Sequence, residues 1–453
     1  MTNCELANRW SVVRLDEACE VILGQSPPGE SYNTEGKGLP FFQGKAEFGD
    51  LYPAPVKWCT KPSKVAQKDD VLISVRAPVG PTNLCPGDAC IGRGLAALRP
   101  RNGIPPRYVL YALRNNVHSL VEQATGSTFE AISGKQLRGH TIPLAPSDEQ
   151  QRVVAEIEKQ FTRLEAGMAS LNRVQVALKR YRASVLKGAC EGRLVLTEAE
   201  LTRKENRSYE SADALLQRIL KERREKWNSK GKYKEPVKRD TSSFPQLPEG
   251  WTWTTVEQLT KDSMIGLDRG RAQQRDDENA GVPYIKMNNV TMDGRVVFDR
   301  VTYVPATDAE AKRFVVREDD ILFNTRNSKE LVGKVGLVRK PPKGAIYNNN
   351  LMRLRFADGV IPSFLNLQMC SHDFRSRMEL IKKATTNVAA VYAKDLFPLP
   401  IALPPLAEQQ RIVAEVERRM SMIEELETMA AADLQRAGRL RQSILQKAFL
   451  GRL

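Results

Sequence analysis

The sequence has few histidines and no cysteine framework. Three histidines and seven cysteines are spread over 453 residues, without a C-x-x-C pair. Zinc sites in proteins need closely spaced His and Cys ligands, so we expect no metal site. An odd number of cysteines without disulfide spacing is typical of reduced thiols in a reducing compartment.

Long apolar runs are also missing. No run approaches the roughly 18 apolar residues of a membrane-spanning helix, and the first ten residues, MTNCELANRW, carry no signal-peptide pattern. We therefore expect no membrane partner and a cytoplasmic location. The chain is instead rich in positive charge, with 69 Lys and Arg against 54 Asp and Glu and a net charge of +15. This excess favours a polyanionic partner, most often nucleic acid.

Complete catalytic motifs are absent as well. Ser26-Pro-Pro-Gly29 lacks the aromatic residue that would stack on a flipped base in an adenine methyltransferase loop. Gly36-Lys37 is not a phosphate-binding loop, because Ser31 and Gly38 stand where Gly and Ser or Thr are needed. We therefore predict no catalytic residues in this chain and no cofactor bound by it.

The chain contains an internal duplication. The stretch from Glu149 to Glu158, EQQRVVAEIE, recurs as EQQRIVAEVE from Glu408 to Glu417. The same offset carries Glu149 to Leu194 onto Glu408 to Leu453 without a gap, with 17 identities in 46 positions. Composition alone does not produce such a match, so the chain is a tandem repeat.

Both copies predict long helices. In the first, apolar residues recur at alternating steps of three and four from Val154 to Leu171, which is typical of a coiled coil. The second keeps this spacing to Ile423 and then places Glu427, Ala430, Asp433 and Ala437 on the same seam. Two such helices need partners, and each is the simplest partner for the other. We predict an antiparallel coiled coil; the alternative is an ordinary buried helix pair within one domain.

The segments before each helix are mixed in character and also match each other. Short β-like runs alternate with Gly- and Pro-rich turns, and the core signals recur at shifting offsets because loop lengths differ. The matched runs are Trp10 to Val13 with Trp253 to Val256, Leu39 to Gln43 with Val282 to Lys286, Asp69 to Arg76 with Asp319 to Arg326, and Leu95 to Arg99 with Leu351 to Arg355. Matching core runs with different loops predict one fold that carries two different surfaces. Two binding sites of different specificity would have this pattern.

These observations divide the chain into five segments. They are a mixed domain at 1–146, a long helix at 147–194, a connecting segment at 195–243, a second mixed domain at 244–405 and a second long helix at 406–453. In the connecting segment, Ser211 to Trp227 predicts a short amphipathic helix with Leu215, Leu216, Ile219 and Leu220 on its apolar side. Asn228 to Ser243 predicts a flexible basic linker.

Polar loop residues at matching places in the two domains are the candidates for reading DNA. Arg, Lys, Asn and Gln contact base edges, and other Lys and Arg neutralise phosphates. The candidates are Gln43, Lys45, Arg76, Arg93, Thr125, Ser127 and Thr128 in the first domain, and Lys286, Asn288, Asn289, Arg326, Asn327, Lys329, Asn349, Thr385 and Asn387 in the second. The alternative for each is a solvated or turn residue, and the Asn348 to Asn350 run is also typical of a turn.

The repeated EQQR-[VI]-VAE helices, each ending in Gly-Arg-Leu, and the Pro-Glu-Gly-Trp251 stretch resemble the specificity subunits of Type I restriction-modification enzymes. The resemblance covers essentially the whole chain. It implies an α+β fold class: two repeated mixed α/β target recognition domains, separated by two long helices that pack as an antiparallel coiled coil with pseudo-two-fold symmetry.

The resemblance also implies a function. Each domain would read one half of a bipartite, gapped target in double-stranded DNA. The chain itself would be non-catalytic and would dock two methylation subunits, which use S-adenosylmethionine to methylate adenine. These would recruit restriction subunits that use ATP and Mg²⁺. The spacer and docking residues implied on the helices are Glu149, Gln150, Arg152, Arg180, Arg182, Glu408, Gln409, Arg411, Arg439 and Arg441.

Two other readings remain open from the residues alone. A coiled-coil scaffold with a basic surface would bind nucleic acid without sequence preference and with a steep salt dependence. A single-chain methyltransferase would require S-adenosylmethionine to bind this chain by itself.

Overall fold

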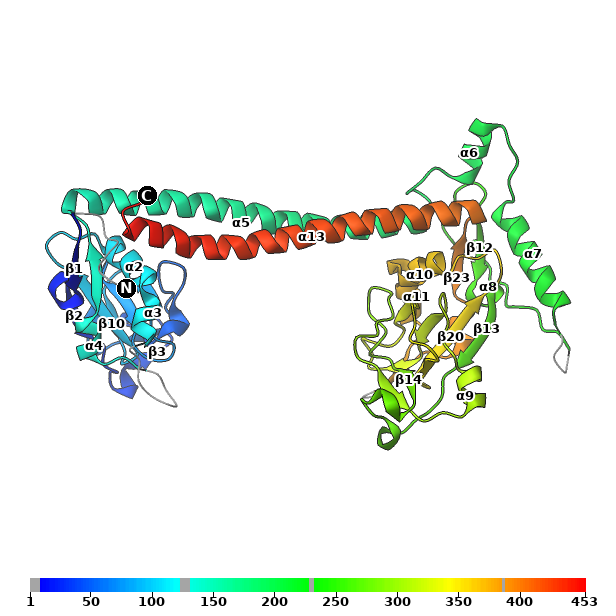
Figure 1. The fold of residues 1–453 in the computed structure, drawn as a ribbon, viewed down its shortest axis with the longest axis horizontal. Helices are drawn as coiled ribbons and strands as arrows, with labels where there is room; N and C mark the ends of the chain where they lie inside the picture. The colour runs from blue at the N-terminus through cyan, green and yellow to red at the C-terminus, as the bar shows by residue number, and fades with distance from the viewer. Residues whose placement is uncertain (1–8, 123–130, 228–231, 385–387) are drawn as a thin grey trace. The chain divides into compact units, whose positions relative to one another are not determined.

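Figure 1 shows the computed structural model of the chain, which describes residues 9–122, 131–227, 232–384 and 388–453. The chain forms two compact units. The N-terminal unit comprises Met1–Gln175 with Thr428–Leu453, and the C-terminal unit comprises Val176–Glu427. Within the described ranges, no helix combines the length and the apolar character that crossing a membrane requires.

The first half of the chain contributes eleven strands and five helices among its described residues. The strands are β1 (Ser11–Arg14), β2 (Cys19–Leu23), β3 (Tyr32–Asn33), β4 (Leu39–Phe42), β5 (Lys57–Cys59), β6 (Val65–Ala66), β7 (Val71–Ser74), β8 (Thr82–Leu84), β9 (Ala89–Ile91), β10 (Leu95–Pro100) and β11 (Thr141–Leu144). The helices are α1 (Leu15–Ala18), α2 (Pro106–Asn115), α3 (Val117–Glu122), α4 (Gly134–Gly139) and α5 (Ser147–Cys190).

The second half repeats this order with a helical insertion before it. The strands of its described residues are β12 (Thr252–Thr255), β13 (Thr260–Ile265), β14 (Val282–Ile285), β15 (Thr302–Val304), β16 (Ile321–Asn324), β17 (Arg326–Asn327), β18 (Val335–Leu337), β19 (Ile346–Tyr347), β20 (Leu351–Phe356), β21 (Lys383–Ala384), β22 (Ala389–Ala390) and β23 (Pro400–Leu403). The helices are α6 (Glu198–Glu205), α7 (Ala212–Glu225), α8 (Val256–Leu259), α9 (Asp308–Arg313), α10 (Pro362–Cys370), α11 (His372–Glu379), α12 (Ala393–Leu396) and α13 (Leu406–Phe449).

The two units share one sheet topology. A four-stranded antiparallel sheet has the order β2-β10-β7-β8 in the N-terminal unit and β13-β20-β16-β18 in the C-terminal unit. A second sheet contains one parallel pair, β4 with β9 or β14 with β19. A two-stranded ladder, β1 with β11 or β12 with β23, precedes the long helix. The predicted α+β class with two repeated domains is therefore confirmed.

A repeated ion pair explains two of the matched sequence runs. Arg99 of β10 donates two hydrogen bonds to the buried carboxylate of Asp70, at 3.0 and 2.9 Å. In the C-terminal unit, Arg355 of β20 donates to the buried carboxylate of Asp320 at 2.6 and 2.9 Å. A bidentate pair satisfies a carboxylate that burial would otherwise destabilise. The pair thus joins adjacent strands of the four-stranded sheet at the same place in both units.

One predicted match is wrong. The sequence pairs Trp10 with Trp253, but Trp10 precedes β1 and Trp251 precedes β12. The ladders agree, since Ser11 pairs with Leu144 and Thr252 with Leu403. Trp10 therefore corresponds to Trp251. Trp251 and Trp253 lie two residues apart, so either could be aligned with Trp10 from the sequence. Only the strand register shows that the correct partner is Trp251.

Each long helix contributes to the cores of both units. The start of α5 buries Ile157 and Phe161 in the N-terminal unit, where the end of α13 buries Ile444, Leu445, Ala448 and Phe449. The start of α13 buries Ile412 and Val416 in the C-terminal unit, where the end of α5 buries Val185 and Ala189. Neither mixed domain is therefore complete without a segment from the other repeat.

The two helices run antiparallel within each unit. In the N-terminal unit, Arg441 lies 3.3 Å from Glu165, and its guanidinium lies 4.8 Å from the ring centroid of Phe161. In the C-terminal unit, Arg182 lies 3.1 Å from Glu427. The two arginines occupy the same position of the repeat. The predicted antiparallel packing is confirmed.

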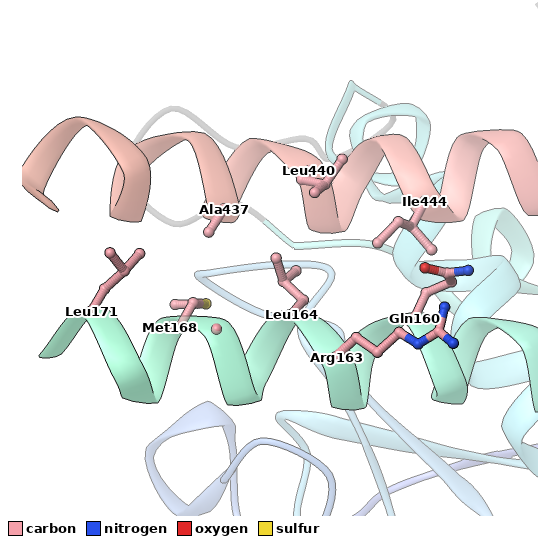
Figure 2. Close-up of a pocket in the computed structure, with 9 residues that line it drawn as sticks. Gln160, Arg163, Leu164, Met168, Leu171, Ala437, Leu440 and Ile444 are labelled. Atoms are coloured by element: carbon pink, nitrogen blue, oxygen red, sulfur yellow. The ribbon is translucent and has the colours of Figure 1, made fainter. Parts of the chain in front are cut away.

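Small residues weaken the packing in the middle of the helix pair, as the second copy of the repeat predicts. Figure 2 shows the side chains of Leu164, Met168 and Leu171 on α5 facing those of Ala437 and Ile444 on α13. Gly167 lines the same hollow. Ala437 and Ala430 are buried in the seam, where a leucine would fill more of the space. A small pocket between the helices results.

The connecting segment is more structured than predicted. Helix α7 buries Ala212, Leu215, Leu216 and Ile219 in the C-terminal core, which confirms its predicted apolar side. Helix α6 has no counterpart in the prediction. Its N-terminal residue Glu198 is buried and forms ion pairs with Arg207 and with Arg411 of α13, so α6 packs against the start of α13.

The N-terminal unit buries a histidine that the other unit lacks. His140 is 2% exposed, and its Nε2 atom has no hydrogen-bond partner in the described part of the chain. Burial lowers the pKa of His140 from 6.5 to about 4. The matching position is Leu399, since each residue directly precedes the strand that leads to the long helix.

We expect His140→Leu to reduce the acid sensitivity of the N-terminal unit. The fold favours neutral imidazole, so this stabilisation is complete above pH 6.5 and is lost as the pH falls towards 4. The loss amounts to about 3 kcal/mol at most. Thermal unfolding of the full chain at pH values from about 7 to 4.5 measures it. An equal fall in Tm for both proteins would contradict the assignment.

Candidate nucleic-acid interface

Three loops of the N-terminal unit meet at one edge. The Gly92 amide donates to the Phe42 carbonyl at 2.8 Å, and the Val75 amide donates to the Gly94 carbonyl at 2.9 Å. These bonds hold together the loops that follow β4, β7 and β9. Three predicted residues, Gln43, Arg76 and Arg93, lie on these loops with exposed side chains.

The C-terminal unit builds the same edge from the same strands. The Asn348 amide donates to the Ile285 carbonyl at 2.9 Å, and the Thr325 amide donates to the Asn350 carbonyl at 2.9 Å. The loops after β14, β16 and β19 therefore meet as their counterparts do. Two of them carry the predicted residues Lys286 and Asn349, and the predicted Arg326 begins β17 directly after Thr325.

A glycine in each unit lets the backbone come close at this edge. An added Cβ at Gly94 would lie 2.3 Å from the Gln43 carbonyl oxygen. An added Cβ at Gly266 would lie 2.3 Å from the carbonyl oxygens of Tyr347 and Asn348. Any side chain at these positions would push the loops apart. The two glycines therefore allow the close approach of the loops that carry the candidate residues.

The matched positions carry different chemistry in the two units. When the strands of the two units are aligned, Gln43 corresponds to Lys286 and Arg93 corresponds to Asn349. The third pair of equivalent positions, Arg76 and Arg326, is arginine in both units. Amide and guanidinium groups form bidentate contacts with different base edges. The two edges therefore share one arginine and differ in the two residues beside it.

The remaining candidates divide by exposure. Lys45, Asn288 and Lys329 are exposed, and Lys286 and Asn349 are half-buried. The ammonium of Lys286 donates to Gln274 at 3.0 Å. Thr125, Ser127, Thr128, Thr385 and Asn387 lie outside the described residues.

Two predicted asparagines hold the backbone. Asn289 is buried, accepts the Lys286 amide at 2.9 Å and donates to the Val297 and Arg300 carbonyls at 3.0 Å. The prediction that Asn289 contacts DNA is therefore wrong, because all of these bonds face the protein. Asn327 is half-buried, donates to Asn324 at 2.9 Å and accepts the Ser328 amide. Its amide supports the turn after β17.

Lys334 supports the turn that carries the exposed Asn288, and no sequence pattern selects it. The Lys334 ammonium donates to the carbonyls of Met287 and Val290, on either side of that turn. Burial lowers the pKa of Lys334. The aligned residue of the N-terminal unit is Pro81, which has no ammonium group to make these bonds. A lysine directly before a β-strand carries no signal that its ammonium binds the carbonyls of another loop.

The repeated glutamates on the long helices face their own domains. Trp10 Nε1 donates to Glu149 at 2.9 Å, and Trp251 Nε1 donates to Glu408 at 2.8 Å. Glu408 is fully buried, which raises its pKa, and it also accepts the Glu198 amide at 2.8 Å. The docking role implied for Glu408 is wrong for its side chain, which no partner can reach.

The neighbouring glutamines act in the same way. Gln150 donates to the Ala145 carbonyl at 2.9 Å, and Gln409 donates to the Pro404 carbonyl at 3.0 Å. Both side chains are buried. Arg411 forms an ion pair with Glu198 at 2.5 Å. The two glutamines therefore hold the start of each long helix to the preceding strand, and Arg411 holds α13 to α6.

Three predicted docking arginines stay available. Arg152, Arg180 and Arg439 are exposed, whereas Arg182 and Arg441 are occupied across the helix pair. Docking by the exposed arginines stays a prediction. In the part of the chain that the structure describes, no cluster of three or more His, Cys, Asp or Glu side chains is placed to hold a metal ion.

The fold and the two edges define a duplicated α+β protein with two related but chemically different surfaces and a shared pair of long helices. The family described as the Type I restriction modification DNA specificity domain matches residues 8–173 and 255–429. The chain belongs to this family, as a specificity subunit of a Type I restriction-modification system.

Relatives agree with this assignment. The chain is 24% identical over 423 residues to the Type I restriction enzyme EcoKI specificity subunit of Escherichia coli K12, covering 90% of this chain and 80% of that protein. It is 39% identical over 187 residues to the putative type I restriction enzyme MjaX specificity subunit of Methanocaldococcus jannaschii, covering 41% of this chain and 44% of that protein.

Solved structures share the fold. The HsdS subunit of Thermoanaerobacter tengcongensis aligns over 100% of this chain and 99% of its own, with a TM-score of 0.58 and 21% identity. A chain from a study of assembly and conformational transition of the type I R-M system aligns over 99% of both chains, with a TM-score of 0.64 and 21% identity. At this identity the likeness concerns the fold.

Proposed function

We propose that each mixed domain reads one half of a bipartite, gapped sequence in double-stranded DNA. The observation that carries the proposal is the pair of matched edges, with Gln43, Arg76 and Arg93 in one unit and Lys286, Arg326 and Asn349 in the other. Arginine at a shared position suits guanine or phosphate, and the variable amide and ammonium neighbours suit different bases. The net charge of +15 favours the same partner.

The two long helices make the reading bivalent. Once one domain binds its half-site, the second contact is intramolecular, so two modest affinities combine. A stiff helical connection restricts the gap between half-sites to a set number of base pairs. In this proposal α5 and α13 act as the spacer.

The proposal assigns the chemistry to partner subunits. The chain docks two methylation subunits, which use S-adenosylmethionine, and through them restriction subunits that use ATP and Mg²⁺. Arg152, Arg180 and Arg439 are the exposed repeat residues that could face such a partner. Binding of S-adenosylmethionine to this chain alone would instead support a single-chain methyltransferase.

We expect Arg76→Ala and Arg326→Ala to weaken recognition of one half-site each. Losing a bidentate base contact costs about 1–3 kcal/mol, or roughly 5- to 150-fold in affinity. Selection of bound duplexes by the full chain, from a library with both halves randomised, measures this. Each variant should relax one half of the selected motif and leave the other half unchanged.

The alternatives give different results in the same selection. A scaffold without sequence preference enriches no motif and shows a steep salt dependence. An arginine that contacts only phosphate lowers the binding of all sequences equally. Arg180→Ala is the matched control, because this exposed arginine lies on α5 and not on the loops that carry the candidate base-reading residues.

A further inference from the structure

A short ribbon of three strands in the C-terminal unit carries Arg326. Ala390 of β22 pairs with Arg326 of β17 on one side and with Lys383 of β21 on the other. Residues directly opposite in a ladder point to the same face of the sheet. Arg326 and Lys383 are both exposed, so this face is the outer one.

Tyr392 continues this outer face. Ala389 and Val391 are each 1% exposed, whereas Tyr392 is 48% exposed, as the alternation of an extended chain requires. The Val391 amide donates to the Thr325 carbonyl at 2.9 Å, which holds Tyr392 beside the strand end that carries Arg326. An aromatic ring and two basic groups therefore share one surface.

Lys383 connects these groups. Its ammonium lies 5.6 Å from the centroid of the Tyr392 ring and 3.6 Å from a carboxylate oxygen of Asp395. A cation near the ring face is attracted by the π electrons. The lysine thus restrains the exposed ring, so a contact made by the ring costs less conformational entropy.

The N-terminal unit has a different residue at this position. Ala131 bridges to Arg76 as Ala390 pairs with Arg326, which aligns Ser133 with Tyr392. The Ser133 hydroxyl accepts the Gln136 amide at 3.2 Å and caps the start of α4. Tyr392 occupies the same cap position of α12 without a side-chain hydrogen bond to the helix. The C-terminal unit therefore has an exposed ring where the other unit has a stabilising cap.

We propose that Tyr392, restrained by Lys383, is a specificity-determining residue for the half-site that the C-terminal domain reads. This inference rests on the proposed function. The ring is an apolar surface beside Arg326 and suits contact with a base edge, such as the thymine methyl group, while the basic neighbours suit phosphate or guanine. No sequence pattern selects Tyr392, because its counterpart is a serine.

The test is the duplex selection described above, with full-length Tyr392→Ser, Tyr392→Phe and Lys383→Ala. Tyr392→Ser installs the N-terminal unit's residue and offers α12 a cap. We expect it to keep or raise the Tm of the chain while weakening binding to the preferred C-terminal half-site about tenfold. Tyr392→Phe should keep the preference, because it keeps the ring. Lys383→Ala should reduce affinity with a smaller loss of preference.

The outcomes separate the failure of this inference from failure of the proposed function. If wild-type protein selects no bipartite motif, the proposed function fails. If it does, and Arg326→Ala alters the C-terminal half while Tyr392→Ser alters nothing, only the role of Tyr392 is wrong. If Tyr392→Ser lowers the affinity for all DNA sequences equally, Tyr392 contacts the sugar-phosphate backbone of the DNA, and the proposal is also overturned. Arg76→Ala is the control that should alter only the other half.

Discussion

Removal of residues 444–453 should unfold the N-terminal domain and leave the C-terminal domain folded. The deleted segment contributes Ile444, Leu445, Ala448 and Phe449, which are buried in the N-terminal core. The Phe449 ring lies 5.3 Å from the ring centroid of Tyr108 and 6.4 Å from that of Trp10. Loss of one buried phenylalanine costs about 3–5 kcal/mol, against a typical domain stability of about 5–15 kcal/mol.

Hydrogen exchange of the full chain and of the truncated chain locates the effect. We expect amides of β7 and β10 to lose protection, and those of β16 and β20 to keep it. Removing only Gly451 to Leu453, which are exposed, is the matched control and should change neither unit. Phe449→Ala should act in the same direction but more weakly. Equal protection of β7 and β10 in truncated and intact chains would contradict the shared core.

Lengthening both long helices by seven residues should change the gap in the DNA target but neither half of it. A heptad after Gln175 in α5 and one after Glu427 in α13 keep the facing pattern of the antiparallel pair. Each helix grows by about 10.5 Å, which equals up to about three base pairs at 3.4 Å each. The added base pairs also rotate the half-sites about the DNA axis, so we expect weaker binding as well.

The duplex selection described above measures the length of the gap and the sequence of each half-site separately. A heptad inserted in α5 alone is the control, because it moves the facing residues out of register and should reduce binding without defining a new gap. A double insertion that selects the original gap would show that the helices do not act as a spacer. A double insertion that alters the half-site sequences would show that the insertion disturbs the domains.

Much of the fold follows from repetition in the sequence. Matched strand runs and one ungapped helix repeat predict two similar units, because core positions tolerate few changes while loops diverge. The register of Trp10 does not follow, since Trp251 and Trp253 both fit the pattern. Helix α6 does not follow either, because its eight residues, six of them polar, carry too little apolar periodicity to predict a helix.

Only some residues of the candidate interface could be predicted from the sequence. Gln43, Arg76 and Arg326 could be selected because they follow β-like runs, and strand ends gather at one edge. The sequence does not say which way an asparagine faces, so Asn289 was selected although it holds a turn together. Glu149 and Glu408 have an equivalent structural role in the two units, because each accepts a hydrogen bond from a tryptophan of its own domain. Tyr392 emerges only after the strands align it with Ser133.

A map of modified adenines across the source cell's genome tests the central claim most directly. It compares the intact chain, a deletion of the chain and Arg326→Ala. The account predicts that methylation of one bipartite, gapped motif disappears on deletion, and that Arg326→Ala changes the half read by the C-terminal domain alone. A map that is unchanged by the deletion, or a variant that changes both halves equally, would contradict the assignment of one domain to each half-site.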